Sequence, residues 1–292
     1  MRWYRPRRGA YPWRVRPTPY RVLVSEVMLQ QTQAGRVVPS FERFVDRFPS
    51  ITDLARAPRS EVVRAWSGLG YNRRAVALSQ AARAVVADHD GRIPRSREHL
   101  RRLPGVGPYT AAAIGSLAFG EPVAAVDTNV RRVVARALLG VDGAQASPAQ
   151  VGEAAERWID RRDPGGFNQA LMDLGREVCR PVPRCDACPL SGGCRFRRGR
   201  RPARRGTSDP AGIAGSARPQ PAFQGSSRQA RGRVVEALRA RRWATLAGLA
   251  REAGVPPSTV ALAVRALAAD GIVRASPAAT AGRPSGRVAL AD

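Results

Sequence analysis

Residues 103–114 read LPGVGPYTAAAI, and the fold can be inferred outward from these twelve residues. Two glycines, Gly105 and Gly107, stand two positions apart between one helical pattern and another that follows. Glycine allows the tight turn that this spacing requires, and proline is favoured in the first turn of a helix. The segment therefore predicts a hairpin of two helices, with the backbone N–H groups of Gly105 and Gly107 directed outward at the start of the second.

The start of a helix carries unpaired N–H donors and a partial positive charge, which together attract phosphate. Arg101 and Arg102 precede this hairpin and add positive charge. A glycine pair alone is equally compatible with a plain turn. With the two arginines and the following helix, the segment favours a sequence-independent contact with a DNA backbone through Gly105 and Gly107.

The rest of residues 20–178 is also predicted to be helical, because apolar residues recur at helical spacing and strand-like alternation is scarce. Glycine, proline and capping aspartate or serine separate the patterns. The predicted helices are 20–33, 40–48, 51–66, 73–88, 96–102, 108–119, 128–139, 148–161 and 167–178. The fold class is therefore all-α.

The composition changes at residues 196–227, which are rich in arginine, proline, glycine and serine and are predicted to form a basic, flexible linker. Residues 228–292 then contain three helical patterns and two short strand-like runs, typical of a winged helix-turn-helix. A three-helix bundle without DNA contact is the alternative. If the unit binds duplex DNA, we expect the contact through residues 258–267, Arg265, Arg283 and Arg287.

The chain of 292 residues is strongly basic, with a formal net charge of +26. Such a charge attracts polyanions and favours a nucleic-acid partner. All 49 basic residues are arginine, so Schiff-base chemistry through a lysine side chain is excluded. The longest apolar runs are too short to span a bilayer, and the basic N-terminus lacks a following apolar segment. We expect a cytoplasmic, nucleoid-associated monomer that does not bind membranes.

Four cysteines fall within sixteen residues, in the spacing C-x5-C-x2-C-x5-C. In a cytoplasmic chain this clustering favours a metal site over disulfides. Four thiolates are compatible with either zinc or an iron–sulfur cluster, and the spacing does not separate the two. The predicted ligands are Cys179, Cys185, Cys188 and Cys194.

Two carboxylates stand in positions that suggest a catalytic role. Glu26 lies within an apolar helical stretch, where burial would raise the pKa of its carboxyl and suit it to donate a proton. An exposed position at the polar edge of that helix is the alternative. Asp127 stands between an apolar run and a helix, where aspartate is also a preferred helix cap.

Taken together, several motifs resemble the adenine DNA glycosylases of MutY type, in the helix-hairpin-helix superfamily that includes endonuclease III. They are SEVMLQQTQ (25–33), GLGYNRR (68–74), LPGVGPYTAAAIGSLAFG (103–120), VDTNVRRVVAR (126–136), NQALMDLG (168–175) and the four cysteines. The resemblance implies two helical lobes and a [4Fe–4S] cluster on the cysteines. The expected domain of residues 1–195 has a six-helix lobe at about 19–122 and a cluster lobe at about 1–18 and 123–195. Residues 228–292 do not resemble the Nudix-like domain that reads 8-oxoguanine in this family.

The resemblance also implies roles for individual residues. Glu26 matches the acid that protonates an extruded adenine, and Asp127 matches the carboxylate that stabilises the sugar cation. Tyr109 takes the position where bifunctional relatives carry a lysine nucleophile, and Asn129 matches a polar partner in the pocket. Residues that wedge into the duplex and contact the base opposite adenine are matched by Gln31, Thr32, Leu69 and Tyr71.

The expected activity is hydrolysis of the N-glycosidic bond of adenine opposite 8-oxoguanine or guanine in double-stranded DNA, as part of base excision repair. The chain would be monofunctional, because it has no lysine side chain for strand cleavage. One alternative is a thymine or uracil mismatch glycosylase on the same scaffold. The other is a DNA-binding protein without catalysis.

Overall fold

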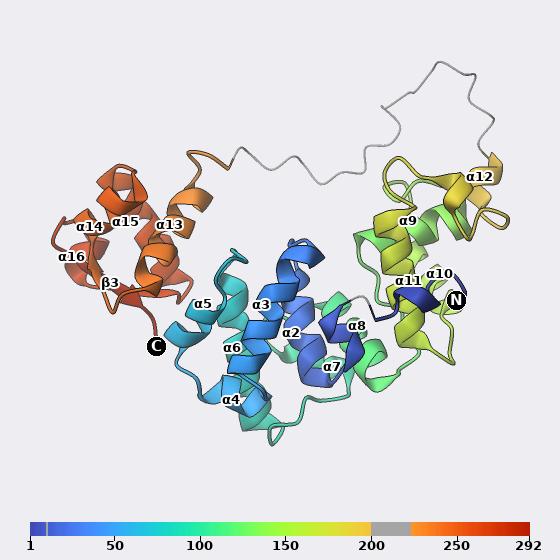
Figure 1. The fold of residues 1–292 in the computed structure, drawn as a ribbon, viewed down its shortest axis with the longest axis horizontal. Helices are drawn as coiled ribbons and strands as arrows, with labels where there is room; N and C mark the ends of the chain where they lie inside the picture. Colours follow the sequence, from blue (N-terminus) through green and yellow to red (C-terminus); the bar gives the residue numbers. More distant parts are fainter. Residues whose placement is uncertain (10, 200–222) are drawn as a thin grey trace, which may run out of the picture. The chain divides into compact units, whose positions relative to one another are not determined.

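The computed structural model describes residues 1–9, 11–199 and 223–292, and these group into two compact units (Figure 1). Unit 1 contains residues 1–26, 95–102 and the described residues from 106 to 199. Unit 2 contains residues 27–94, 103–105 and 223–292. These boundaries differ from those of the two expected lobes, because the units meet within α2 (Pro19–Leu29), after Glu26. The division into a six-helix lobe and a cluster lobe stays a prediction.

The described residues of unit 1 form helices and the loops that connect them, and none of them forms a strand. Helices α7 and α8 pack against each other and form the predicted hairpin. The helix α11 packs against both α8 and α9. The elements are η1 (Arg5–Arg7), α1 (Pro12–Val15), α7 (Arg97–Arg102), α8 (Pro108–Phe119), α9 (Thr128–Val134), η2 (Ala135–Leu139), α10 (Pro148–Trp158), α11 (Pro164–Glu177), η3 (Cys185–Ala187) and α12 (Arg195–Gly199).

Glycine brings α11 unusually close to α9. A Cβ atom added at Gly175 would lie 2.6 Å from the Cβ atom of Asn129, closer than packed carbon atoms approach one another. Val130, Val133 and Leu174 fill the buried core beside this crossing. The helix crossing therefore fixes the backbone of the first turn of α9, which follows Asp127.

Unit 2 has a helical part and the C-terminal winged-helix unit, which we define as residues 227–292. In the winged-helix unit β3 pairs antiparallel with both β1 and β2, in the order β1-β3-β2. The elements are α3 (Ala34–Arg47), α4 (Ile51–Arg56), α5 (Arg59–Ala65), α6 (Arg73–Asp88), α13 (Ser227–Arg239), β1 (Ala244–Thr245), α14 (Leu246–Ala253), α15 (Pro257–Ala269), β2 (Val273–Ala275), α16 (Pro277–Thr280) and β3 (Arg287–Leu290).

Most predicted helices are confirmed, and the differences have local causes. The pattern at 20–33 ends earlier, at Leu29, because Gln31 adopts a left-handed backbone with φ +55°. Pro58 interrupts the pattern at 51–66, which forms α4 and α5. The two predicted strands form, and β1 adds a third. Helix α12 extends to Gly199 and α13 starts at Ser227, while linker residues 200–222 lie outside the described residues.

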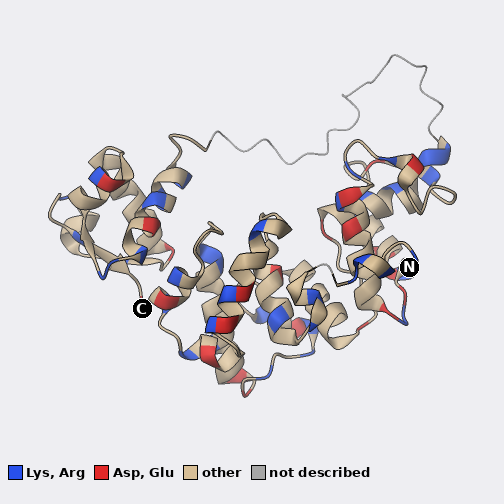
Figure 2. Ribbon diagram, in the orientation of Figure 1, with Lys and Arg blue, Asp and Glu red and all other residues tan. Residues whose placement is uncertain are grey.

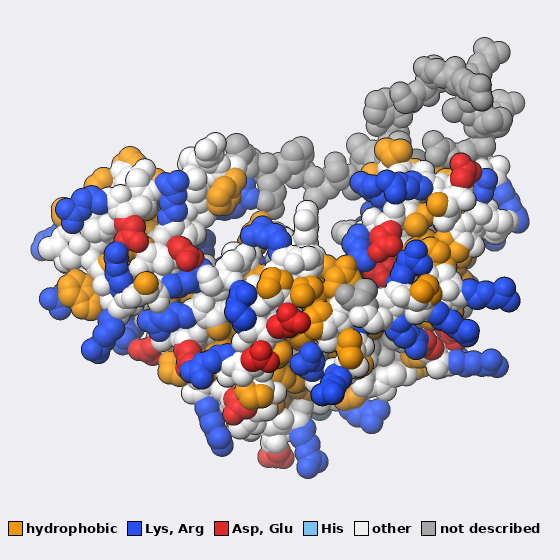
Figure 3. Space-filling model, viewed as in Figure 1, with side chains coloured by type: hydrophobic (Ala, Val, Ile, Leu, Met, Phe, Trp, Pro, Cys, Tyr) orange, Lys and Arg blue, Asp and Glu red, His pale blue; other side chains and the backbone are white. Residues whose placement is uncertain are grey.

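Arginine is distributed over both units rather than confined to the basic segment near residue 200. Figure 2 shows basic residues on helices of each unit, and Figure 3 shows arginine side chains over the visible face, with fewer acidic ones among them. Within the described residues, no helix combines the length and hydropathy needed to cross a bilayer. The charge is thus a property of the folded units and is suited to a long polyanion.

Candidate active site

Unit 1 brings together three side chains that the sequence singles out. Glu26 comes from α2, Tyr109 from the first turn of α8, and Asp127 from the residue that precedes α9. The Tyr109 hydroxyl donates a hydrogen bond to the Glu26 carboxyl, and the Asp127 charge acts on both groups. Residues about a hundred positions apart in the sequence thus converge on one site.

The Glu26 carboxyl is buried, with 5% of the residue exposed. Burial is the main reason that its pKa rises from 4.5 to about 7, and the negative charge of Asp127 raises it further. The hydrogen bond from Tyr109 and the charge of Arg14 act in the opposite direction. A carboxyl with a pKa near neutrality is suited to deliver a proton at physiological pH. Its burial excludes the alternative of an exposed helical glutamate.

Asp127 is both a helix cap and a candidate catalytic carboxylate. Its Oδ1 accepts a 2.6 Å hydrogen bond from the backbone N–H of Val130, and its Oδ2 accepts one of 3.0 Å from the Asn129 amide. Burial raises the pKa of Asp127, while these two hydrogen bonds and the charge of Arg132 lower it. Two carboxyls with such different surroundings can hold different protonation states in one site.

Arg132 holds Asn129 in place from the other side. It donates 2.9 Å to Asn129 Oδ1, 2.7 Å to the Gly175 carbonyl and 2.6 Å to the Cys179 carbonyl. The Asn129 amide is thereby oriented with its NH2 group toward Asp127. In the sequence, the only signal for Arg132 is its place in the VDTNVRR motif.

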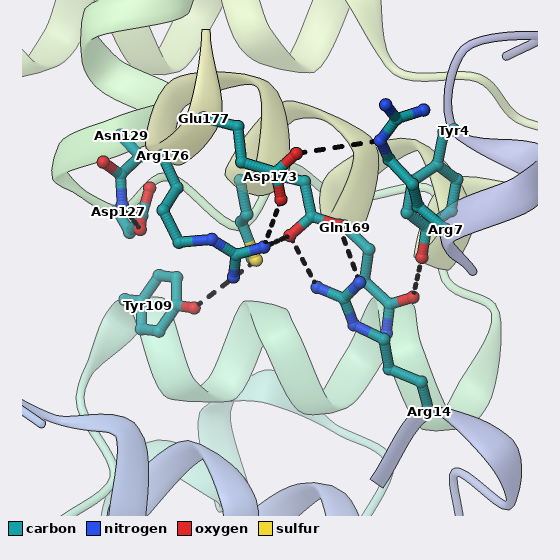
Figure 4. A network of polar contacts seen from close by, with 11 residues as sticks. Tyr4, Arg7, Arg14, Tyr109, Asp127, Asn129, Gln169, Asp173, Arg176 and Glu177 are labelled. Carbon is teal, nitrogen blue, oxygen red and sulfur yellow. Dashed lines mark hydrogen bonds and ion pairs between the residues drawn. The ribbon is translucent and has the colours of Figure 1, made fainter. Parts of the chain in front are cut away.

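A buried ion pair between Arg14 and Asp173 lies in the same unit and was also missed. Arg14 Nη1 and Nη2 donate to the two Asp173 oxygens at 2.7 and 2.9 Å, and both side chains are almost fully buried. Figure 4 shows Arg14 and Arg176 pointing toward Asp173, and Asn129 toward Asp127. Tyr4 extends this network by donating to Gln169 Oε1. The network anchors the N-terminal segment to α11.

The residues expected to contact the duplex lie in unit 2, on two loops at residues 30–32 and 68–71. Gln31 and Tyr71 are exposed, and both have left-handed backbones, with φ +55° and φ +45°. Non-glycine residues rarely adopt this conformation, which is found at functional sites where the surroundings enforce it. Leu69, in contrast, is buried, with only 4% of the residue exposed.

A single buried guanidinium enforces both loops. Arg74 donates to the carbonyls of Met28 and Gln30 on one side, and to those of Leu69 and Gly70 on the other. It also donates to Thr32 Oγ1 at 3.1 Å. Burial lowers the pKa of Arg74 to about 10, so the group stays charged at neutral pH. The sequence offered no signal for Arg74 beyond its place in GLGYNRR.

The hairpin glycines occupy the positions that the sequence predicts. Gly105 has φ +77°, and a Cβ atom there would lie 2.9 Å from Ala77 Cβ, so both the backbone conformation and the packing require glycine. Gly107 is the N-cap residue of α8, and its own carbonyl accepts from the N–H of Ala111. An added Cβ atom at Gly107 would meet nothing, which leaves this helix start open to a ligand.

The four cysteines are free thiols that line one small cavity of about 20 Å³. Arg136 lies against it, with Nη1 3.7 Å from Cys179 Sγ and an ion pair of 2.6 Å to Asp142. Within the described residues, no three potential ligands surround the position of a single metal ion. The donor set nevertheless fits an iron–sulfur cluster, because four thiols face one space and positive charge lies beside them.

Comparison with known proteins shows the family to which this chain is similar. The family model described as "HhH-GPD superfamily base excision DNA repair protein" matches residues 24–161. The adenine DNA glycosylase of Mycolicibacterium smegmatis is 40% identical over 242 residues, which cover 82% of this chain and 78% of the relative.

Two solved structures are also similar. A thermostable thymine-DNA glycosylase has a TM-score of 0.60 at 35% identity, covering 64% of this chain and 88% of that one. An endonuclease III trapped as a covalent intermediate with DNA has a TM-score of 0.55 at 27% identity, covering 62% and 85%. The helical fold and these matches identify a base excision repair protein. The chain belongs to the HhH-GPD superfamily and, within it, to the family of the adenine DNA glycosylases.

Proposed function

We propose that this protein is a monofunctional glycosylase that hydrolyses the N-glycosidic bond of adenine opposite 8-oxoguanine or guanine in duplex DNA. The observation that carries the proposal is the buried Glu26 carboxyl, hydrogen-bonded to Tyr109 and beside Asp127. Cleavage of a glycosidic bond needs a proton on the leaving group and a negative charge near the developing sugar cation. Glu26 supplies the proton, and Asp127 supplies the negative charge.

In this proposal Glu26 is the acid. With a pKa of about 7, a substantial fraction of the carboxyl is protonated at neutral pH, and the proton goes to a ring nitrogen of the extruded adenine. Protonation turns the base into a neutral leaving group. The Tyr109 hydroxyl fixes the carboxyl, and it keeps its own proton because burial and the two carboxylates raise its pKa well above 10.

Asp127 stabilises the sugar cation. Its two oxygens are held by Val130 N–H and the Asn129 amide, so the carboxylate keeps one position as charge develops. Arg132 and Gly175 fix Asn129 behind it. Water then completes the hydrolysis, because the site offers no amine nucleophile: Tyr109 takes the place of a lysine, and the sequence contains none.

The adenine has to leave the base stack before these carboxyls can reach it. The exposed Gln31 and Tyr71, on loops held by Arg74, are the side chains we propose to contact the duplex beside the base opposite adenine. Gly105 and Gly107 would contact the phosphate backbone through their N–H groups. Cys179, Cys185, Cys188 and Cys194 would hold a [4Fe–4S] cluster, which would cross-link four points of that loop through iron–thiolate bonds.

Single-turnover base release tests the proposal on duplexes that contain A:8-oxoguanine, A:G, T:G or U:G pairs. We expect adenine release from the first two and none from the others. Glu26→Gln is expected to abolish release, whereas Glu98→Gln, which alters an exposed helical glutamate, leaves it unchanged. Release of thymine or uracil without adenine would instead support a mismatch thymine or uracil glycosylase. Unchanged release by Glu26→Gln would contradict the assigned mechanism.

A further inference from the structure

The C-terminal winged-helix unit is docked on α5 and on the loop after it, within unit 2. Arg239, at the end of α13, donates to the Ser67 hydroxyl and to the Asn72 amide oxygen, both at 3.2 Å. In return, Arg64 donates 3.0 Å to the Arg239 carbonyl. The Arg239 side chain is only 12% exposed, so these hydrogen bonds are shielded from water.

The C-terminal end of the same unit makes a second group of contacts. Arg59 donates 3.1 Å to the Gly271 carbonyl, and the Ser60 hydroxyl donates 2.7 Å to Asp292. Arg73 forms an ion pair of 3.3 Å with Asp270. Figure 1 shows β3 beside α5. Two separated sets of polar contacts fix the orientation of the unit better than one set would.

The docked unit closes one side of a groove of about 930 Å³ in unit 2. The other wall is formed by the loops that we propose to contact the duplex, including Gln31, Leu69 and Tyr71. From the side of the docked unit, the lining includes Phe223, Arg228 and Arg231.

The chemistry of this lining favours a polyanion. Five of the described lining residues are arginines and none is acidic, while Asp270, outside the lining, pairs with Arg73 and Arg231. Arg228 and Arg231 come from α13, and Phe223, shortly before that helix, is 60% exposed. Arginine beside an exposed aromatic ring is the combination that binds a nucleic-acid strand, through phosphate contact and stacking.

We propose that this groove binds the DNA strand opposite the extruded adenine, and that the winged-helix unit grips the phosphates of that strand through Arg228 and Arg231 of α13. The strand assignment rests on the proposed function, in which Gln31 and Tyr71 contact the base opposite adenine. A strand that passes these two residues runs along the groove and meets α13. The expected contact through Arg265, Arg283 and Arg287 is a separate prediction, since none of these lines the groove.

Binding measurements that need no base release test this inference. The probe is a fluorescent duplex of about 30 base pairs with a tetrahydrofuran abasic analogue opposite guanine, titrated by anisotropy at several salt concentrations. Arg228→Gln combined with Arg231→Gln is expected to weaken binding at least tenfold and to reduce the slope of log Kd against log salt by about 1.8, or about 0.9 for each lost phosphate contact. Each single variant should lose about half of that slope.

The charge-matched control for the double variant is Arg242→Gln combined with Arg251→Gln, which alters two exposed arginines outside the groove. It should bind like the wild type, and unchanged melting temperatures would show that all variants fold. If the double variant binds like the control, the groove does not hold DNA.

Strand choice is tested by replacing three phosphates beside the guanine with neutral methylphosphonates. This change should weaken the wild type but have little further effect on the double variant. The same change in the abasic strand should weaken both proteins equally. Equal weakening by the guanine-strand change would refute the strand assignment. A wild type that binds but releases no adenine would contradict the proposed function and leave the groove inference standing.

Discussion

Replacing Glu26 with glutamine is expected to abolish adenine release and, at the same time, to stabilise the folded protein at alkaline pH. The reason is the buried position of the carboxyl, whose pKa rises from 4.5 to about 7 on folding. A buried carboxyl is tolerated when protonated but costs free energy when ionised. Glutamine keeps the shape and an oxygen acceptor for Tyr109, and it cannot ionise.

The direction and size of this effect follow from the pKa rise. Below about pH 4.5 the carboxyl is protonated in both the folded and the unfolded chain, so its pKa rise costs no stability. Between pH 4.5 and 7 the unfolded chain ionises first, and stability is lost as the pH increases. At about 1.4 kcal/mol for each pKa unit, the loss reaches about 3 kcal/mol above pH 7. Glu26→Gln removes that loss.

Urea denaturation of the wild type, Glu26→Gln and Glu98→Gln between pH 4.5 and 8.5 measures the effect. The difference in unfolding free energy between Glu26→Gln and the wild type should increase with pH and level off above pH 7. Glu98→Gln should show no such trend, because Glu98 lies exposed on α7. A constant difference for Glu26→Gln across the range would refute the buried, proton-donating carboxyl.

Four further predictions concern the same machinery. Asp127→Asn should reduce single-turnover adenine release by about 10²-fold or more without weakening duplex binding, because the charge that stabilises the sugar cation is lost. In the wild type, the rate of release should decrease above pH 7 as Glu26 loses its proton, and a rate that increases there would contradict its role as the acid. Arg74→Met should destabilise the protein by about 3 kcal/mol or more in urea denaturation, since several buried carbonyls lose their donor. Cys188→Ala should lower the iron content and the visible absorbance of the purified protein, and unchanged iron would refute the cluster assignment.

The fold could be predicted from local signals in the sequence. Gly105 and Gly107 mark the hairpin, and helix 108–119 has the predicted bounds because proline starts it and Gly120 ends it. The left-handed backbone of Gln31 was not predictable, since no residue type marks it and Arg74 stabilises it from more than forty positions away. Side chains that act at a distance in the sequence leave no local pattern.

The candidate site was predictable only in part. Glu26 and Asp127 were recognisable because a carboxylate beside apolar residues is costly to bury. The resemblance of their motifs to one family then predicted that the two residues share a site. The pair of Arg14 and Asp173 was missed, because a buried ion pair 159 positions apart looks like two ordinary charged residues in the sequence. The docking of the winged-helix unit was not predictable either, because nothing in the sequence distinguishes Arg239 from the other arginines.

The left-handed loops at Gln31 and Tyr71 have a consequence for how the protein finds its target. Such backbone conformations cost about 1–3 kcal/mol each, and the strain is met during folding by the hydrogen bonds of Arg74. The two loops are consequently rigid before any DNA arrives. If Gln31 and Tyr71 contact the duplex as proposed, the protein meets each base pair with a preformed surface, and the slow step of inspection is the deformation of the duplex.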